Sequence, residues 1–248
     1  MSSFPNSGEA AGGTGRLWAS RARRGPGKIL RLAVIKLLFL CASASAFAQN
    51  WTFLYKADGI EVFTDGASPP TFKAEGILDV DVVDILAVFC DVPRRTEWVR
   101  NLGESRVIQD NHFDRALIYS RYNLPWPASD RDSLIETNYT NDYRNGEVTI
   151  QFHAVATEGE PPIKGVIRIP KVTGVLHLKI LAKGTTAVRY EVNLDAGGWL
   201  PIWICNFFIR DAPIQMLRAM KQRISETKSL YREFKDAQIR LWHADRRD

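Results

Sequence analysis

"YNLPWPASDRD", residues Tyr122 to Asp132, is the stretch of sequence that decides the fold. Two prolines and a tryptophan stand before an Asp-Arg-Asp cluster, between two segments in which apolar and polar residues alternate. Proline cannot continue a strand ladder, so it ends the first strand, and aspartate favours turns. The stretch by itself predicts a turn in which Asp130 caps, Arg131 is solvated and Asp132 accepts backbone N–H bonds. The alternative is a site in which Arg131 or Asp132 faces a cavity.

Strand patterns dominate the chain on both sides of this turn. Alternating segments bounded by Pro, Gly and Asn predict strands over residues 59–65, 71–79, 115–124, 132–142, 146–156, 164–170, 175–181 and 186–195. In the last segment Val188, Tyr190, Val192 and Leu194 point one way, because successive strand side chains alternate between faces. Such a sheet has one dry face and one wet face.

Two segments have a helical period instead. Residues 79–92 form a short apolar helix, with an aspartate at its start able to cap the free N–H groups. Residues 211–234 predict one long amphipathic helix that begins at Asp211, with Pro213 in its first turn. Its apolar stripe is Leu217, Met220, Ile224, Tyr231 and Phe234. These elements predict an α+β fold, a curved antiparallel sheet around one helix, with a ligand cavity where the two do not close.

The first 48 residues differ in composition from the rest. Residues 1–27 are rich in Gly, Ser and Arg and are expected to be disordered. Residues 28–48 combine basic residues, an apolar run of about ten and small residues before Gln49, the layout of a cleaved secretory signal. The run is shorter than the ~20 residues that span a bilayer. We therefore expect export, to the periplasm in a Gram-negative bacterium; the alternative is a membrane anchor formed by residues 30–48.

The leader also accounts for the positive charge. The whole chain carries a net charge of +5, but from Gln49 onward 26 Lys and Arg face 27 Asp and Glu, a net charge of −1. A protein that binds a phosphate backbone needs a surplus of cations on its folded domain. No nucleic-acid partner is therefore expected.

Residues 49–235 contain no low-complexity linker and no internal repeat, and they read as one domain. Residues 236–248 are a tail that either prolongs the last helix or binds a partner through Trp242. We expect a monomer.

Residues of the types that carry catalysis or bind metals show no recognisable spacing. The histidines are scattered, no Ser or Cys lies in a nucleophile elbow, and no metal-ligand spacing occurs. No catalytic residue, metal or cofactor is predicted. Cys90 and Cys205 lie in apolar contexts that suit two buried thiols, although export would permit a disulfide.

Three segments, taken in order, resemble the START (steroidogenic acute regulatory protein-related lipid transfer) domain family. "YSRYNLPWPASDRDSL" (119–134) resembles its strand, Pro-rich turn and Arg-Asp signature. "IKGVIRIPKVTGVLHL" (163–178) is similar to its central strands, and "VNLDAGGWLPIWICN" (192–206) looks like its Asp-x-x-Gly-Trp-x-Pro loop before the C-terminal helix. The resemblance covers about residues 51–234.

The resemblance implies a helix-grip fold that encloses a tunnel for one lipid or sterol, in a family whose members mostly lack catalytic machinery. The residues that match the family's motifs are Arg131, Asp132, Asp195, Gly198, Trp199 and Pro201. Some members carry a further arginine inside the cavity, and here that position is Thr137, with Glu136 beside it. This departure means that the identity of the ligand does not transfer.

Two groups of residues are candidates for function. The ligand-binding candidates are Arg121, Arg131, Asp132, Tyr190, Val192, Leu194, Trp199, Leu217, Met220 and Ile224, with Tyr119 and Glu136 as further polar contacts. The lid candidates are Gly197, Gly198, Trp199, Leu200, Ile202 and Trp203. Tryptophan prefers a membrane interface and the two glycines allow flexing, so these residues predict a loop that opens against a membrane. The alternative is that they seal the core under the helix.

The sequence thus predicts a protein that binds one hydrophobic ligand, a lipid or sterol, and carries it between membranes by transient contact. The alternatives are a helix-grip enzyme acting on a hydrophobic substrate and a non-transferring interaction module of the cell envelope.

Overall fold

The computed structural model describes residues 50–111, 115–142, 144–156, 160–227 and 229–245 of the 248-residue chain. The predicted disordered leader, the signal with its cleavage site and the alternative membrane anchor lie outside the described residues.

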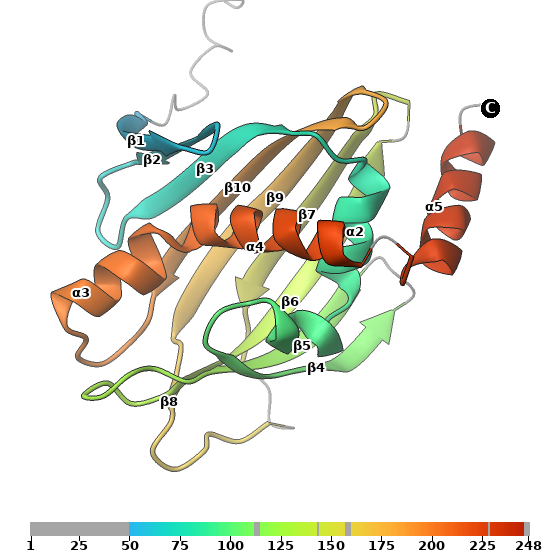
Figure 1. Ribbon diagram of the computed structural model, residues 1–248. Helices are drawn as coiled ribbons and strands as arrows, with labels where there is room; N and C mark the ends of the chain where they lie inside the picture. The colour runs from blue at the N-terminus through green and yellow to red at the C-terminus, as the bar shows by residue number, and fades with distance from the viewer. Residues whose placement is uncertain (1–49, 112–114, 143, 157–159, 228, 246–248) are drawn as a thin grey trace, which may run out of the picture. The chain divides into compact units, whose positions relative to one another are not determined.

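One curved ten-stranded sheet forms the frame of the molecule (Figure 1). Its order is β1-β2-β3-β10-β9-β7-β6-β5-β4, and all neighbours in this order are antiparallel, while the short β8 pairs parallel with β6. The strands are β1 (Thr52–Ala57), β2 (Ile60–Thr64), β3 (Thr71–Leu78), β4 (Leu102–Asn111), β5 (Arg115–Tyr122), β6 (Arg131–Asp142), β7 (Glu147–Ala154), β8 (Ile167–Arg168), β9 (Lys171–Ala182) and β10 (Thr185–Asp195).

Helices lie against the concave side of this sheet, and α4 crosses it (Figure 1). The helical elements are α2 (Val82–Cys90), the 3-10 turn η1 (Pro93–Glu97), α3 (Ile202–Cys205), the π-helical η2 (Asn206–Arg210), α4 (Ala212–Glu226) and α5 (Arg232–Asp245). A sheet wrapped around a C-terminal helix is the helix-grip fold, as predicted. In the described part of the chain, no helix has the length and apolar character needed to cross a membrane.

The single helix predicted over residues 211–234 is wrong, because α4 ends at Glu226 and α5 begins at Arg232. Thr227 leaves the helical conformation, and its hydroxyl donates to the carbonyl of Arg223 at 2.7 Å. Threonine competes for backbone groups in this way and favours helix ends. The start was placed correctly at Asp211, but its carboxylate accepts hydrogen bonds from Tyr55 and Arg210 and does not cap the helix.

The helix α5 absorbs most of the tail and packs on α2. The Tyr231 hydroxyl, just before α5, donates to the Asp91 carboxylate at 2.9 Å, and Lys235 Nζ lies 2.8 Å from Asp84 Oδ1. Phe234 packs against the central core. Tyr231 and Phe234 therefore belong to the α2–α5 contact and not to the stripe of α4.

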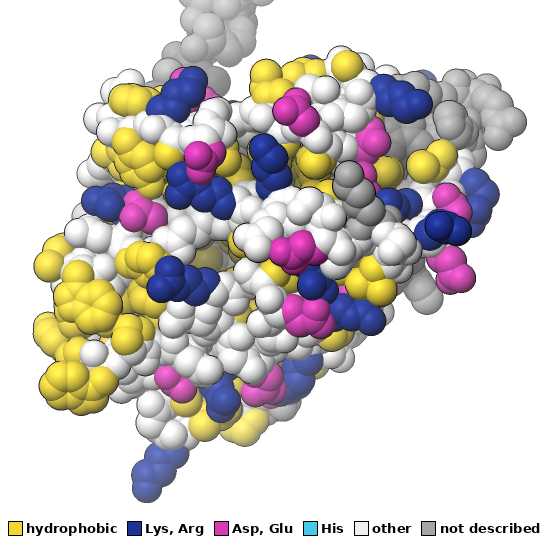
Figure 2. Space-filling model, in the orientation of Figure 1, with side chains coloured by type: hydrophobic (Ala, Val, Ile, Leu, Met, Phe, Trp, Pro, Cys, Tyr) yellow, Lys and Arg dark blue, Asp and Glu magenta, His cyan; other side chains and the backbone are white. Residues whose placement is uncertain are grey.

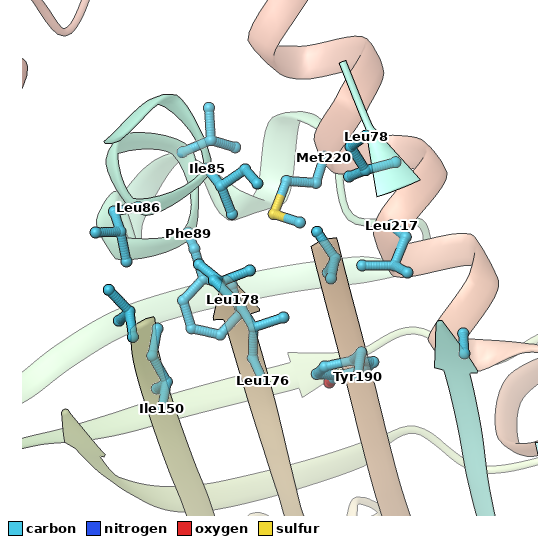
Figure 3. Packing of buried hydrophobic residues seen from close by; sticks show 14 of the residues in the cluster. Leu78, Ile85, Leu86, Phe89, Ile150, Leu176, Leu178, Tyr190, Leu217 and Met220 are labelled. Carbon is cyan, nitrogen blue, oxygen red and sulfur yellow. The ribbon is translucent and has the colours of Figure 1, made fainter. Parts of the chain in front are cut away.

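The core fills the half of the concave face that lies under α2 and the C-terminal part of α4. Figure 3 shows Leu217 and Met220 of α4 facing into the core, with Met220 directed toward α2. The predicted dry face of β10 is also confirmed, since Val188, Tyr190 and Val192 are all buried.

Replacement of Leu217 by alanine tests its place in this core. The side chain is 0% exposed, so Leu217→Ala should lower the free energy of unfolding by about 2–5 kcal/mol, measured by urea denaturation. Lys221→Ala, on the exposed side of the same helix, is the control and should change it by less than about 0.5 kcal/mol. A loss no larger than that of the control would contradict the core assignment.

Candidate functional site

A cavity of about 250 Å³ lies in the other half of the concave face, between the sheet and the segment from α3 to α4. Its apolar walls include Ile118, Ile135, Val172, Leu194, Phe207 and Met216. The volume is just below the ~300–1,000 Å³ typical of small-molecule sites. A single slender apolar chain suits this space, whereas a bulkier ligand requires the helices to move outward.

An aromatic pair marks the border between this cavity and the filled core. Phe152 and Tyr190 stack with ring centroids 5.8 Å apart, and both line the cavity. A Cβ atom at Gly174, which pairs with Phe152 across the strands, would overlap the Phe152 ring. Glycine at this position therefore leaves room for the Phe152 ring to lie flat against the sheet. Beyond it, Ile150 and Leu176 belong to the core.

Arg131 is buried at the edge of the cavity, with 2% of its surface exposed. Its guanidinium donates to the carbonyl oxygens of Ser129 (2.5 Å), Gly197 (2.9 Å), Trp199 (3.3 Å) and Ala196 (3.4 Å). Burial lowers the pKa of Arg131. The solvated arginine that the turn pattern predicts is wrong, because the Asp195–Pro201 loop arrives over it from 65 residues further along the chain.

Asp132 points to the opposite face of the sheet, because neighbouring strand residues alternate. It is 0% exposed and accepts two hydrogen bonds from Arg168, at 2.7 and 2.9 Å. Arg168 also donates to the carbonyl of Glu160. Asp132 therefore joins β6 to β8, the strand that pairs with it in the sheet, and the structure does not bring Asp132 to the cavity.

The two glycines of the predicted lid adopt a backbone conformation that would be strained for other residues. Gly197 and Gly198 have φ values of +65° and +61°, the left-handed region that favours glycine. A Cβ at Gly197 would lie 2.9 Å from Pro170, and one at Gly198 would lie 2.9 Å from Ile167. The loop is thus packed closely against the β8 segment beneath it.

The lid candidates divide between the inside and the outside of the molecule. Leu200 lines the cavity, whereas Trp199, Ile202 and Trp203 are 69%, 74% and 51% exposed. Ile202 and Trp203 lie in α3, not in a loop as predicted. Figure 2 shows apolar side chains gathered on the side where Figure 1 places α3. The reading that these residues only seal the core holds for Leu200 but not for the two tryptophans.

The remaining candidates fall in three places. Tyr190, Val192 and Leu194 line the cavity. Leu217, Met220 and Ile224 were predicted as ligand contacts but belong to the core, and α4 faces the cavity with Ala212, Gln215, Met216 and Ala219. Arg121, Tyr119 and Glu136 alternate with cavity residues on their strands and are absent from its lining. The helical period predicts correctly which face of α4 is turned inward. It does not distinguish the residues that pack in the core from those that line the cavity.

Further polar cavity residues come from η1 and from the strands, and of these the sequence did not reveal Arg95 and Tyr122. Arg95 lies 4.6 Å from the centre of the Phe89 ring and donates twice to the Phe89 carbonyl, at 2.5 and 3.1 Å. Tyr122 faces the cavity with Tyr190, and burial raises the pKa of both hydroxyls. Thr137 also lines the cavity and donates to the carbonyl of Ala116 at 3.2 Å.

Cys90 and Cys205, the two cysteines among the described residues, are both free thiols. Burial raises the pKa of Cys90 to about 11, which makes it a poor nucleophile. Among the described residues, no group of three or more His, Cys, Asp or Glu could hold a metal ion.

The sequence profile of the START domain matches residues 40–229. The chain belongs to the START domain family. The cavity between the sheet and the C-terminal helix therefore lies in a member of that family.

Individual relatives agree with this assignment. An uncharacterized protein of Pseudomonas aeruginosa is 31% identical over 196 residues, which is 78% of this chain and 96% of the relative. The phosphatidylcholine transfer protein of Rattus norvegicus is 23% identical over 182 residues, 69% of this chain and 82% of the relative. The crystal structure of a STAR-related lipid transfer protein fragment from Xanthomonas axonopodis has a TM-score of 0.62 and 25% identity, covering 71% of this chain and 98% of that one.

Lysine at position 131 should loosen the lid. The lysine ammonium group keeps the positive charge. It lacks the planar guanidinium that donates to the carbonyls of Ser129, Gly197 and Trp199 at the same time. Arg131→Lys should therefore speed amide hydrogen exchange over residues 197–205 more than over β10, which serves as the internal reference.

Arg189→Lys is the matched control, since Arg189 is an exposed strand arginine that pairs with Glu191. It should leave exchange in the lid unchanged. Equal protection of the lid in the Arg131→Lys variant and the parent protein would show that this arginine does not hold it.

Proposed function

We propose that the protein binds one lipid in this cavity and transfers it between membranes. One observation supports this proposal most strongly. The cavity is mostly apolar, and the segment that covers it exposes apolar side chains to solvent. Each square ångström of apolar ligand surface removed from water contributes roughly 25 cal/mol, so a lipid chain gains most of its affinity from the walls. The lipid transfer proteins among the relatives support this reading.

The cover of the cavity is the part that we expect to touch a membrane. Leu200 and Ile204 face inward, and Trp199, Ile202 and Trp203 of the same segment face solvent. Tryptophan is enriched at membrane interfaces, where its amphipathic ring lies at headgroup level. When these side chains insert into a membrane, they displace the segment that closes the cavity. Membrane docking and cavity opening are therefore coupled.

The segment that follows α3 is suited to such movement. Residues Asn206–Arg210 form a π-helical turn directly before α4. This geometry is rare and is found mostly at functional sites, where it interrupts the regular helical ladder. We propose that α3 and this turn swing together about the start of α4 when the ligand enters or leaves.

A carrier fits the lining better than an enzyme does. No His, Asp, Glu or Cys of the described residues lines the cavity, and these are the usual general acids, bases and nucleophiles. We further propose that the protein acts after export, as a monomer, with the leader removed.

The tryptophans of the cover provide a test of membrane docking. Trp199→Ala and Trp203→Ala should each weaken binding to phospholipid vesicles several-fold in a sedimentation assay, because each removes an exposed apolar ring. Their free energy of unfolding should change by less than about 0.5 kcal/mol, as is usual for surface positions.

Ile77→Ala removes an equally exposed apolar side chain from β3 and is the matched control. It should bind vesicles like the parent protein. Equal loss of stability and vesicle binding in the tryptophan variants would mean that the rings only support the fold. Failure of the parent protein to move any labelled lipid between vesicles would contradict the transfer function itself.

A further inference from the structure

Three arginines line the cavity without an acidic partner. Arg95 lies against the Phe89 ring, Arg100 lies 4.4 Å from the centre of the Phe207 ring, and Arg131 donates only to carbonyl oxygens. None of the three forms an ion pair within the described part of the chain. No Asp or Glu of that part lines the cavity either. The cavity therefore carries positive charge that the protein does not neutralise.

Several arginines outside the cavity pair with carboxylates instead. Arg94, next to Arg95, pairs with Asp91 at 3.0 Å. Arg106 and Arg168 bind the carboxylates of Glu160 and Asp132, both at 2.7 Å, and Arg223 pairs with Glu97 at 2.5 Å. Arg131 is buried and Arg95 is partly buried, whereas Arg100 is exposed. An enclosed cation without a counter-ion is costly, so Arg131 and Arg95 indicate that the missing anion comes from outside.

Neutral donors stand beside these cations. The hydroxyls of Tyr122 and Tyr190 face the cavity and make no hydrogen bond to another described side chain. A tyrosine hydroxyl is protonated at neutral pH, and burial raises the pKa of both further. Ser120 and Ser133 add two more hydroxyls to the lining. A protonated phenol donates to an oxygen anion, and guanidinium matches the planar or tetrahedral oxygens of carboxylate and phosphate.

We propose that the cavity selects an acidic amphiphile, whose carboxylate or phosphate group meets the arginines while its apolar chain lies along the walls. This inference rests on the proposed function and narrows its ligand. A phosphatidylcholine headgroup has a net charge of zero and brings a quaternary ammonium that the arginines repel. It is therefore the disfavoured ligand of a cavity with this lining.

The test compares three labelled lipids that share one acyl chain: a fatty acid, a phosphatidic acid and a phosphatidylcholine. Each is present only as a trace in otherwise identical phosphatidylcholine vesicles, so the surface charge that the protein meets is constant. Transfer of the label to acceptor vesicles is followed after addition of the purified protein. At least one acidic label should move about tenfold faster than the phosphatidylcholine label, and the faster of the two tells whether carboxylate or phosphate is preferred.

Variants assign the selectivity to the cavity. Arg95→Gln should slow transfer of the acidic label several-fold and leave the phosphatidylcholine label unchanged, while Arg95→Lys should keep part of the selectivity. Arg94→Gln is the matched control on the neighbouring, outward-facing arginine and should change neither rate. Arg100→Gln, at an exposed position, serves if Arg95→Gln lowers the melting temperature strongly.

Two results would overturn the inference. Phosphatidylcholine moving as fast as both acidic labels would reject the acidic ligand but keep the proposed lipid transfer. Selectivity that survives in both Arg95→Gln and Arg100→Gln would also reject it, since the cavity arginines would not be its source. Transfer of none of the three lipids would instead reject the proposed function, and with it this inference.

Discussion

Two neighbouring residues at the start of β6 hold the functional half of the molecule together from both faces of the sheet. Arg131 reaches the concave side and binds the carbonyls of the Asp195–Pro201 loop. Asp132 reaches the other side and binds Arg168 of β8, the strand that pairs with the start of β6. Strand alternation makes this possible, since adjacent side chains must point in opposite directions. One Arg-Asp pair therefore fastens both the Asp195–Pro201 loop and β8 to a single strand.

The two attachments differ in kind. The Asp132–Arg168 pair joins opposite charges in a buried setting, and breaking such a pair leaves an uncompensated charge. Arg131 is held by carbonyl dipoles alone, so an incoming anion could replace some of its acceptors without leaving it unsatisfied. The strand β8 is thus held by an ion pair, whereas the loop over the cavity is held by acceptors that an incoming anion can replace.

The sequence allowed the sheet, its apolar face and the family to be predicted, because alternation and the ordered motifs are local patterns. The strands β1 and β4 were missed, since register shifts interrupt their alternation. The shift in β1 lies between Phe53 and Tyr55, and those in β4 lie between Leu102 and Glu104 and between Val107 and Gln109. The break after Glu226 was missed because the apolar period continues across it. Both errors arise where local geometry departs from an otherwise regular pattern.

The cavity itself was harder to predict than the fold. Arg131 and Arg95 acquire their environment from segments distant in sequence, and nothing local distinguishes Arg95, which faces the cavity, from Arg94, which faces solvent. Likewise the stripe of α4 contains Leu217 in the core, while its neighbour Met216 faces the cavity. Such distinctions depend on where the sheet curves away from the helix. The hydrophobic period of a single segment carries no information about that position.

Native mass spectrometry of the protein purified from the cells that make it tests whether the cavity carries an acidic lipid. We predict an added mass of one lipid per chain, released by an organic solvent and identified in the extract as an acidic species. A protein that carries no lipid, and that takes up none of an offered series of acidic and zwitterionic lipids, would contradict it.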